Sequence, residues 1–317
     1  MGNQTILNEL FLSGLSDIPA LQLPLFLFFL LIYLLTITWN LLIIFLVVIN
    51  SHLHTPMYFF LGNLAALDLC CSSVTVPRML FDLLTQRRKI TVTSCMTQCF
   101  FFLSFASSEP ILFSVMSYDR YTAVCQPLHY MLIMNWKVCI QLASIVWCLG
   151  FTNASIHTLG ALNLTFCESD IVESFFCDLP QLLQISCSDI FINILLIFIM
   201  GVFIVAGSLT LTILPYVSIF KTVLKIQFKG KRSKVFSTCS SHLMVVFIFY
   251  CSIMFNYFRP NTNNHFFADK VVSVFYTVIV PLLNPLIYSL RNQDFRKAFQ
   301  SVFFNKIFPP KYRNHLR

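Results

Sequence analysis

Long hydrophobic runs, separated by short polar segments, dominate this chain. A helix needs about 20 mostly apolar residues to cross a bilayer, and seven runs reach that length. They predict membrane helices at 24–49, 57–77, 95–124, 138–160, 190–220, 235–258 and 271–290. We therefore expect an all-α integral membrane protein with one seven-helix bundle over residues 24–290. Residues 1–23 form an N-terminal tail, and residues 291–317 form a C-terminal helix and tail.

A different pattern follows the last run. Phe295, Phe299 and Phe303 recur at every fourth residue, while charged and polar residues take the other faces. That spacing predicts a short amphipathic helix over 292–304, lying along the membrane surface.

The composition excludes a soluble globular domain. The chain is 57% hydrophobic and 11% charged, whereas soluble domains are about 45–50% apolar and about 25% charged. The net charge of +8 is better explained by Lys and Arg retained on the cytoplasmic side of a membrane than by nucleic-acid binding. We expect membrane lipid, and no nucleic acid, as a partner.

The distribution of basic residues predicts the orientation. If the N-terminus is outside, 15 of the 21 Lys and Arg residues fall on the cytoplasmic side and six on the outer side. The positive-inside rule then favours an extracellular N-terminus and a cytoplasmic C-terminus in the plasma membrane. Asn3, in the triplet Asn-Gln-Thr, becomes a candidate glycosylation site on the outer tail.

Four of the 12 cysteines fall at or beyond the predicted outer face: Cys95, Cys167, Cys177 and Cys187. Outer loops face an oxidising compartment, so we expect disulfides there. Four cysteines allow three pairings, which spacing alone leaves open. No histidine lies near them at metal-ligand spacing, and no metal site is expected.

Charged residues inside membrane spans are costly and are functional candidates. Asp119 and Arg120 stand side by side where the third run reaches the cytoplasmic face. At 1.5 Å per residue, Asp68 lies about 18 Å from Pro56, and Glu109 lies about 16 Å outward from Arg120. Both acids reach mid-membrane. They either share a sodium ion or a proton, or are each neutral and hydrogen-bonded to neighbours such as Asn40 or Asn284.

Asn284 and Pro285 interrupt the seventh run, and Tyr288 follows them. Proline removes a backbone hydrogen bond and bends a helix. The bend is either a pivot for a conformational change or a static kink, which membrane helices tolerate.

Four motifs resemble a known family. They are Leu-His-Thr-Pro-Met-Tyr-Phe-Phe-Leu at 53–61, Met-Ser-Tyr-Asp-Arg-Tyr at 116–121, Lys-Val-Phe-Ser-Thr-Cys-Ser-Ser-His-Leu at 234–243 and Pro-Leu-Leu-Asn-Pro-Leu-Ile-Tyr-Ser-Leu-Arg-Asn at 281–292. Asp-Arg-Tyr at the inner end of the third of seven spans resembles the rhodopsin-like G protein-coupled receptors. The four motifs together, in order over nearly the whole chain, resemble the olfactory receptors among them.

The resemblance implies an odorant receptor that activates a stimulatory heterotrimeric G protein and raises cAMP. It implies the disulfides Cys95–Cys177 and Cys167–Cys187, and an odorant pocket in the outer half of the bundle. The implied pocket residues are Phe102, Leu103, Ala106, Ser107, Ile204, Val205, Ile253, Met254, Tyr257 and Thr277. The implied switch residues toward the G protein are Asp119, Arg120, Tyr121, Tyr216, His242, Asn284, Pro285 and Tyr288.

Five residues depart from the family pattern, and one of them is Cys251, which follows Tyr250 where glycine is usual. Trp39 adds bulk where a small residue is usual, and Pro110 and Pro215 leave the local geometry of the third and fifth helices open. Ser117 replaces alanine two residues before Asp119, with an effect on resting activity that the sequence leaves open.

A small transporter or channel is the alternative function. Such folds usually contain two related halves with broken helices at matching places, and no such duplication is visible. No metalloprotease or serine-hydrolase motif stands at a membrane face, so we expect no enzyme activity. The seventh run holds no internal lysine for a retinal Schiff base, and residues 95–108 hold no acid for an amine ligand. A neutral, weakly polar odorant remains, with no cofactor beyond the sodium ion considered above.

Overall fold

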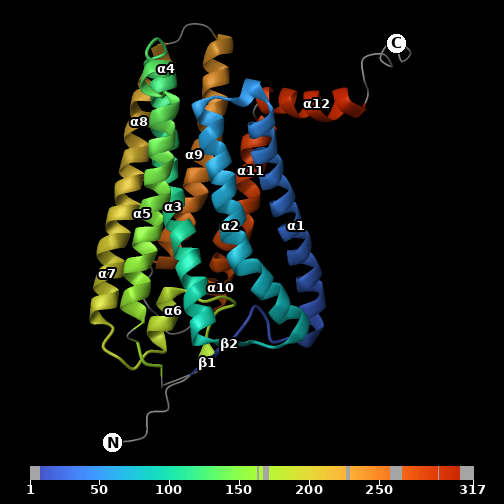
Figure 1. The fold of residues 1–317 in the computed structure, drawn as a ribbon, viewed down its shortest axis with the longest axis vertical. Helices are drawn as coiled ribbons and strands as arrows, with labels where there is room; N and C mark the ends of the chain where they lie inside the picture. Colours follow the sequence, from blue (N-terminus) through green and yellow to red (C-terminus); the bar gives the residue numbers. More distant parts are fainter. Residues whose placement is uncertain are drawn as a thin grey trace, which may run out of the picture.

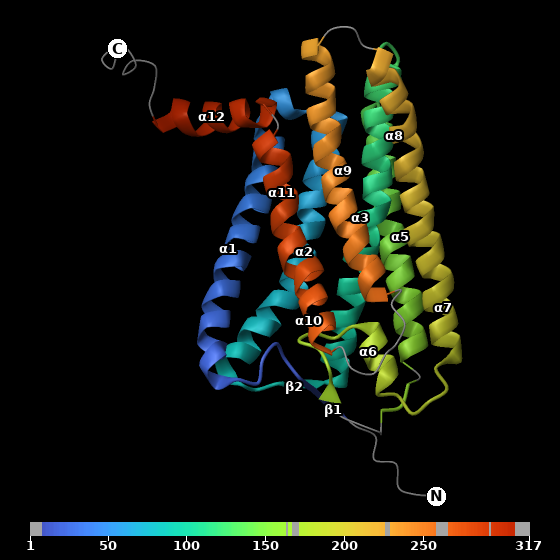
Figure 2. The same ribbon diagram turned by 180° about the vertical axis from the view of Figure 1, so that it is seen from behind.

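The structure, a computed structural model, describes residues 8–162, 164–166, 171–225, 229–257, 266–291 and 293–307. Long helices run side by side and form one bundle (Figures 1 and 2). Their bounds are α1 Pro19–Ile49, α2 Pro56–Thr85, α3 Val92–Cys125, α5 Trp136–Ala161, α7 Phe191–Gly201, α8 Gly207–Lys225, α9 Lys229–Tyr257, α10 Phe266–Val274 and α11 Val280–Arg291. A π-helical turn, η2 Val202–Ala206, joins α7 to α8, and another, η3 Phe275–Ile279, joins α10 to α11. The predicted seven-helix architecture is confirmed.

Within the described residues, six helical stretches are long and apolar enough to cross a membrane. In α9, the remaining apolar stretch is the shorter segment His242–Met254. Short helices connect the long ones: η1 Ser51–Leu53, α4 Tyr130–Ile133 and α6 Leu179–Gln184. The last described helix, α12 Gln293–Ile307, starts beside α11 at one end of the bundle and projects sideways from it (Figure 1).

The predicted end of the second helix, at Pro77, is wrong. The helix continues to Thr85, with Pro77 inside it, because a membrane helix tolerates the loss of one backbone hydrogen bond. Arg78 and Asp82 lie one turn apart in this extension, and their side chains pair at 3.0 Å. The helix ends where Gln86 adopts a left-handed conformation, with φ of 56°.

The predicted amphipathic helix is confirmed as α12, but part of its apolar face packs against the bundle and not against the membrane. Phe295 and Ala298 are buried and belong to the main core of the protein. The helix contacts η1, so part of the apolar stripe holds α12 against the bundle.

Helix α3 lies at the centre of the bundle and contacts α2, α5, α8 and α9. Its contact with α5 is especially close at Gly150. A Cβ atom added to Gly150 would overlap the Ser108 hydroxyl and the Ser104 carbonyl oxygen. Small residues on both helices therefore let the two backbones approach, as is common between membrane helices.

One end of the bundle, here the disulfide end, is closed by a small sheet. Strand β1 Glu9–Leu12 lies between β2 Lys89–Thr91, which is antiparallel to it, and β3 Ile171–Val172, which is parallel. The N-terminal segment is thus fixed across the bundle. The opposite end, where α3 finishes, is called the Arg120 end.

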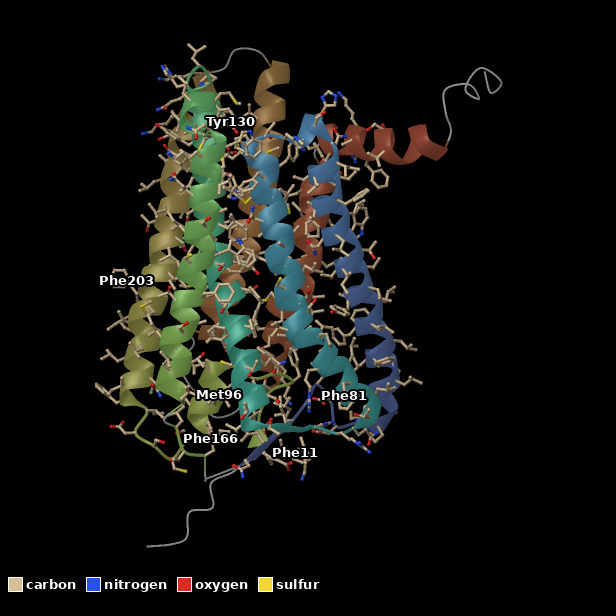
Figure 3. All side chains as sticks on the ribbon, in the orientation of Figure 1. Phe11, Phe81, Met96, Tyr130, Phe166 and Phe203 are labelled. Atoms are coloured by element: carbon tan, nitrogen blue, oxygen red, sulfur yellow. A yellow bond between two sulfur atoms is a disulfide. The ribbon has the colours of Figure 1, made fainter. Side chains whose placement is uncertain are left out.

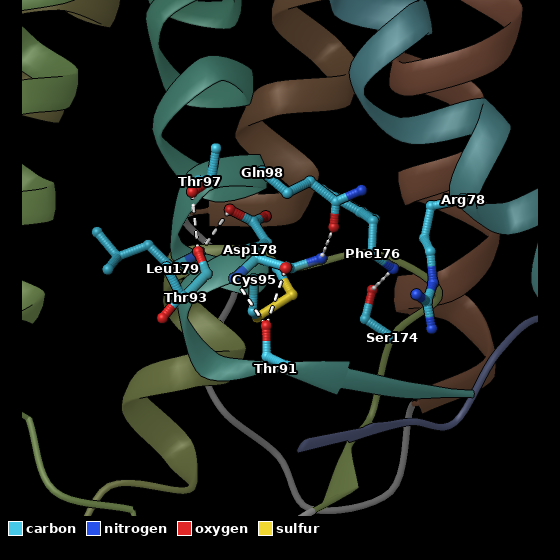
Figure 4. The surroundings of a disulfide bond; sticks show 12 residues. Arg78, Thr91, Thr93, Cys95, Thr97, Gln98, Ser174, Phe176, Asp178 and Leu179 are labelled. Carbon is cyan, nitrogen blue, oxygen red and sulfur yellow. Dashed lines mark hydrogen bonds between the residues drawn. A yellow bond between two sulfur atoms is a disulfide. The ribbon is translucent and has the colours of Figure 1, made fainter. Parts of the chain in front are cut away.

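The predicted Cys95–Cys177 disulfide is present and joins the start of α3 to the segment before α6 (Figure 4). Gln98 lies beside it, accepting a hydrogen bond from the Cys177 N–H at 2.9 Å. The Gln98 side-chain amide also donates to the Val74 carbonyl at 2.9 Å. One glutamine therefore ties α2, α3 and the loop together.

Arg88 holds the N-terminal segment against this end. Its guanidinium donates to the Ser13 and Ser16 carbonyl oxygens and to the Asp17 carboxylate. The hydrogen bond from Arg88 lowers the pKa of Asp17. The ion pair with Asp17 is therefore formed at neutral pH and is lost as the pH falls through that lowered pKa, while the bonds to the two carbonyl oxygens do not depend on it.

The outer surface of the bundle is apolar. Phe203, in the turn between α7 and α8, points away from the helices and is 73% exposed (Figure 3). A protein in water rarely exposes apolar surface on this scale. Such a surface suits hydrocarbon, as the sequence predicted.

The close approach at Gly150 can be tested by adding one methyl group. Gly150→Ala forces α5 away from α3 and is expected to destabilise the protein by about 1–3 kcal/mol. Gly62→Ala in α2 is the control, because the nearest atom to its new Cβ, on Val47, lies 3.8 Å away. Thermal unfolding of the purified protein measures both, and equal stability of the two variants would contradict the packing described.

Candidate functional site

The Arg120 end gathers several of the predicted switch residues. Asp119 is buried, and its carboxylate accepts a hydrogen bond of 2.8 Å from the Tyr130 hydroxyl. Among the ion pairs of the described residues, none joins Asp119 to Arg120. Burial, together with the neighbouring carboxylate, raises the pKa of Tyr130, so its hydroxyl remains a donor. Tyr130 was not predicted, and no sequence motif marks it as a partner of Asp119.

Tyr216, His242 and Tyr288 form a cluster, here the Tyr–His cluster, that joins α8, α9 and α11. The Tyr216 hydroxyl hydrogen-bonds His242 Nδ1 at 2.8 Å, and the two rings stack at 5.6 Å between centroids. The Tyr288 ring lies 6.4 Å from the His242 ring. Arg120 lies within electrostatic reach of all three. The structure thus brings together predicted residues that are far apart in the sequence.

Deeper in the bundle, Asp68 and Asn284 join α2 to α11. Asn284 Nδ2 donates to Asp68 Oδ1 at 2.9 Å, while no described residue bonds Asp68 Oδ2. Glu109 on α3 is also buried, and its charge would repel that of Asp68. Asn40 donates to the Pro281 carbonyl at 3.0 Å and so ties α1 to the same region of α11.

The predicted bend at Asn284–Pro285 lies within α11, which continues through it to Arg291. The π-helical turn η3 ends six residues before Pro285.

No group of three or more His, Cys, Asp or Glu side chains able to hold a metal ion occurs in the described part of the chain.

A line of hydroxyl groups, here the α3–α8 seam, connects α3 with α8 and α9. Ser114 donates to the Ser208 carbonyl at 2.9 Å, and Ser117 donates to the Thr212 carbonyl at 2.7 Å. Ser208 in turn bonds the Tyr250 hydroxyl at 2.6 Å. The departure at Ser117 therefore supplies an interhelical bond that alanine could not make. The feature of the sequence that could have indicated this seam is the presence of Ser and Thr residues at helical spacing on both α3 and α8.

The predicted pocket residues divide into two groups. Phe102 is buried at the disulfide end, with its ring 5.1 Å from Phe176 and 5.9 Å from Tyr276. Thr277 is also buried, and its hydroxyl bonds the Ser273 carbonyl at 2.7 Å. Leu103 is buried too, while Ala106, Ser107, Val205 and Ile253 are partly buried.

The remaining members lie nearer the surface. Met254 is 48% exposed. Ile204 lines a cavity of about 770 Å³ between α3, α5 and α7–α8, and is the one member of the predicted set that does. That cavity was not predicted.

Some predictions fall outside the described residues. These are the glycosylation site at Asn3, the Cys167 half of the second disulfide, and the side chain of Tyr257, whose backbone ends α9. Cys187, the expected partner of Cys167, is disulfide-bonded.

Comparisons with known proteins agree on one family. A family model described as "Olfactory receptor" matches residues 29–306. Olfactory receptor 5B12 of Homo sapiens is 46% identical over 95% of this chain and 96% of its own length. Olfactory receptor 8G17 of Mus musculus is 47% identical over 95% and 98%. The crystal structure of squid rhodopsin has a TM-score of 0.66 at 19% identity, over 93% of this chain and 88% of rhodopsin, and is similar in fold.

The bond between Tyr130 and Asp119 can be tested by removing the hydroxyl. Tyr130→Phe leaves a buried carboxylate without this donor, and is expected to cost about 1–3 kcal/mol of stability. Tyr118→Phe, at a 42% exposed ring on the same helix as Asp119, is the control and should change little.

Thermal unfolding of each variant, alone and combined with Asp119→Asn, provides the measurement. The cost of Tyr130→Phe should shrink in the Asp119→Asn background, because no charge is then left unpaired. Costs that add fully would contradict the assignment.

Proposed function

The chain belongs to the olfactory receptor family of G protein-coupled receptors, and we propose that it detects a small, weakly polar odorant and activates a stimulatory heterotrimeric G protein to raise cAMP. Family members are signalling receptors in the plasma membrane, not enzymes. The observation that carries the proposal is the family match over nearly the whole chain, with Arg120 beside the Tyr–His cluster.

We propose that the disulfide end faces outward and the Arg120 end faces the cytoplasm. The excess of Lys and Arg on the loops at the Arg120 end supports this orientation. The Cys95–Cys177 disulfide supports it as well, because disulfides persist in oxidising surroundings.

The odorant pocket is proposed in the half of the bundle nearest the disulfide. The rings of Phe102, Phe176 and Tyr276 support this location, since they form a buried aromatic cluster that joins α3, the segment before α6 and η3. The Thr277 hydroxyl, beside Tyr276, adds a polar group. Such a mixture suits a small ligand that is mainly hydrocarbon.

Activation is proposed to act on the Tyr–His cluster. Odorant binding would favour a state in which α9 moves away from α3, exchanging the contacts of His242 and freeing Arg120 for the G protein. The direct bond from Tyr216 to His242 supports coupled movement of α8 and α9. The basic residues Lys221 and Lys225, at the end of α8, suit contact with anionic lipid or the partner.

Asp68 and Glu109 are proposed to share a sodium ion or a proton. Their burial supports this, as does the unpartnered Asp68 Oδ2, because two buried carboxylates at one depth are not both stable when charged and unpaired. Either occupant would neutralise that repulsion and favour the resting arrangement of α2, α3 and α11.

The signalling role of Arg120 is tested by removing its charge. Cells expressing the receptor are screened against a diverse odorant panel with cAMP as the readout, and the active odorants are then applied to Arg120→Ala. The response is expected to fall to that of cells without receptor, while an epitope tag shows unchanged surface expression. Arg87→Ala, at an exposed arginine of the disulfide end, should respond normally. Full signalling by Arg120→Ala would overturn the mechanism.

The orientation is tested at the N-terminal sequon. Asn3→Gln should remove a glycan that an N-glycosidase also removes from the wild-type receptor, which appears as a downward shift on an electrophoretic gel. An antibody to a C-terminal tag should stain permeabilised cells alone. Staining of intact cells by that antibody would contradict the proposed orientation.

A further inference from the structure

A membrane-facing groove lies on the flank of the bundle, between α3, α5 and α7–α8. It has a volume of about 770 Å³, within the range of small-molecule sites. Helices α5, α7 and α8 lie together on this flank in both ribbon views (Figures 1 and 2). Most of its lining is apolar, including Ile111, Val115, Leu149, Phe203, Leu211 and Leu214.

The groove opens on the outer surface of the bundle. Phe203, Leu211 and Leu214 line it and are 73%, 61% and 59% exposed. Since this surface lies against hydrocarbon, an occupant would enter from the bilayer and not through the disulfide end. Its entrance therefore differs from that of the proposed odorant pocket around Phe102, although Ile204, one of the implied pocket residues, lines the groove.

Several polar side chains line the groove, and among the described ones Asn153 alone has a buried atom without a hydrogen-bond partner. Asn153 on α5 lines the groove, and its side chain is buried, with an exposed fraction of 5%. Its Nδ2 donates to the Ser107 hydroxyl at 2.8 Å, while its Oδ1 has no hydrogen-bond partner among the described residues. A buried acceptor without a partner is unfavourable. An occupant whose hydroxyl group reaches this buried oxygen can donate to it, whereas a hydrocarbon chain cannot.

The shape of the groove favours an elongated occupant. Its lining on α3 runs from Ile111 to Tyr121, and on the opposite side from Met200 to Ser218. At 1.5 Å per residue these walls are about 15 Å and about 27 Å long. A long hydrocarbon chain fits this extent better than a compact molecule.

The groove has space that a side chain could fill. Gly207 lines it, and no atom lies within 4 Å of a Cβ added there. Ser114 and Ser208 also line it and belong to the α3–α8 seam. An occupant would therefore pack across the junction of the two helices.

We propose that this groove is a second ligand site, which takes a long-chain alcohol from the bilayer with its hydroxyl on Asn153 Oδ1 and its chain between α3 and α8. A lipid acyl chain would leave Asn153 Oδ1 unpaired, and a helix of a second receptor copy is the other occupant that the test below distinguishes. The site needs the membrane-spanning bundle alone and does not depend on the identity of the odorant or of the G protein.

The test uses the full-length receptor in phosphatidylcholine nanodiscs. The two probes are a hexadecanol and a hexadecane, each with the same photoreactive diazirine at mid-chain, and labelled peptides are identified by mass spectrometry. The alcohol should label α3, α5 and α8 saturably, and unlabelled hexadecanol should compete. The alkane should label these peptides about fivefold less, as expected for one lost hydrogen bond.

Two variants separate the contributions. Asn153→Leu should reduce labelling by the alcohol to the level of the alkane. Gly207→Phe should fill the groove and remove saturable labelling by both probes. Leu41→Phe, on the exposed face of α1, is the control and should label like the wild type.

Thermal unfolding reports on folding and on binding together. Hexadecanol should raise the unfolding temperature of the wild type and of Leu41→Phe, but not of Gly207→Phe, because a ligand stabilises the state that binds it. Equal labelling by alcohol and alkane would overturn the proposal in favour of acyl chains. Cross-links between two receptor copies at these helices, formed by a separate bifunctional reagent, would overturn it in favour of a dimer interface.

Discussion

A polar group that a helix buries in an apolar bundle is costly unless it has a hydrogen-bond partner, and because hydrocarbon supplies none, most such partners lie on a neighbouring helix or on the group's own backbone. In this receptor, the buried polar side chains of α3 show how such partners are found. Ser114 and Ser117 bond the backbone of α8, and Asp119 accepts from Tyr130. The positions of α3, α8 and α4 are thus tied by hydrogen bonds and not by apolar packing alone.

The same constraint explains how the two ends of the bundle are related. The seam from Ser114 to Thr212 lies between the aromatic residues around Phe102 and the Tyr–His cluster. Seam bonds to carbonyl oxygens can be exchanged along a helix, since acceptors on the same face of α8 repeat about once per turn. A ligand that shifts α8 against α3 therefore has a route to Arg120 that does not require the apolar core to be repacked.

Much of this architecture follows from the sequence. The seven spans could be predicted because uncharged runs of sufficient length have one stable outcome in a bilayer. The end of α2 could not be predicted, because a proline followed by two charged residues is typical of the end of a membrane helix. The structure shows that Arg78 and Asp82 pair with each other and that the helix continues past Pro77. The family motifs marked Tyr216, His242 and Tyr288, and the structure brings them into one cluster.

Other features depend on the rotation of each helix about its own axis, which hydropathy does not determine. Ser117 was visible as an unusual residue, but its bond to Thr212 required the relative register of α3 and α8. Tyr130 and the groove at Asn153 were missed for the same reason. The predicted pocket residues remain predictions, because the cavity described by the structure contains Ile204 and none of the others.

The central claim is that an odorant acts by moving α8 and α9 relative to the rest of the bundle at the Arg120 end. Spin labels on a genetically encoded amino acid at positions 52 and 221, which are both exposed, allow double electron–electron resonance in nanodiscs. An odorant that raises cAMP should shift the distance distribution toward longer separations in the wild type. A clear cAMP response with an unchanged distribution would contradict the account.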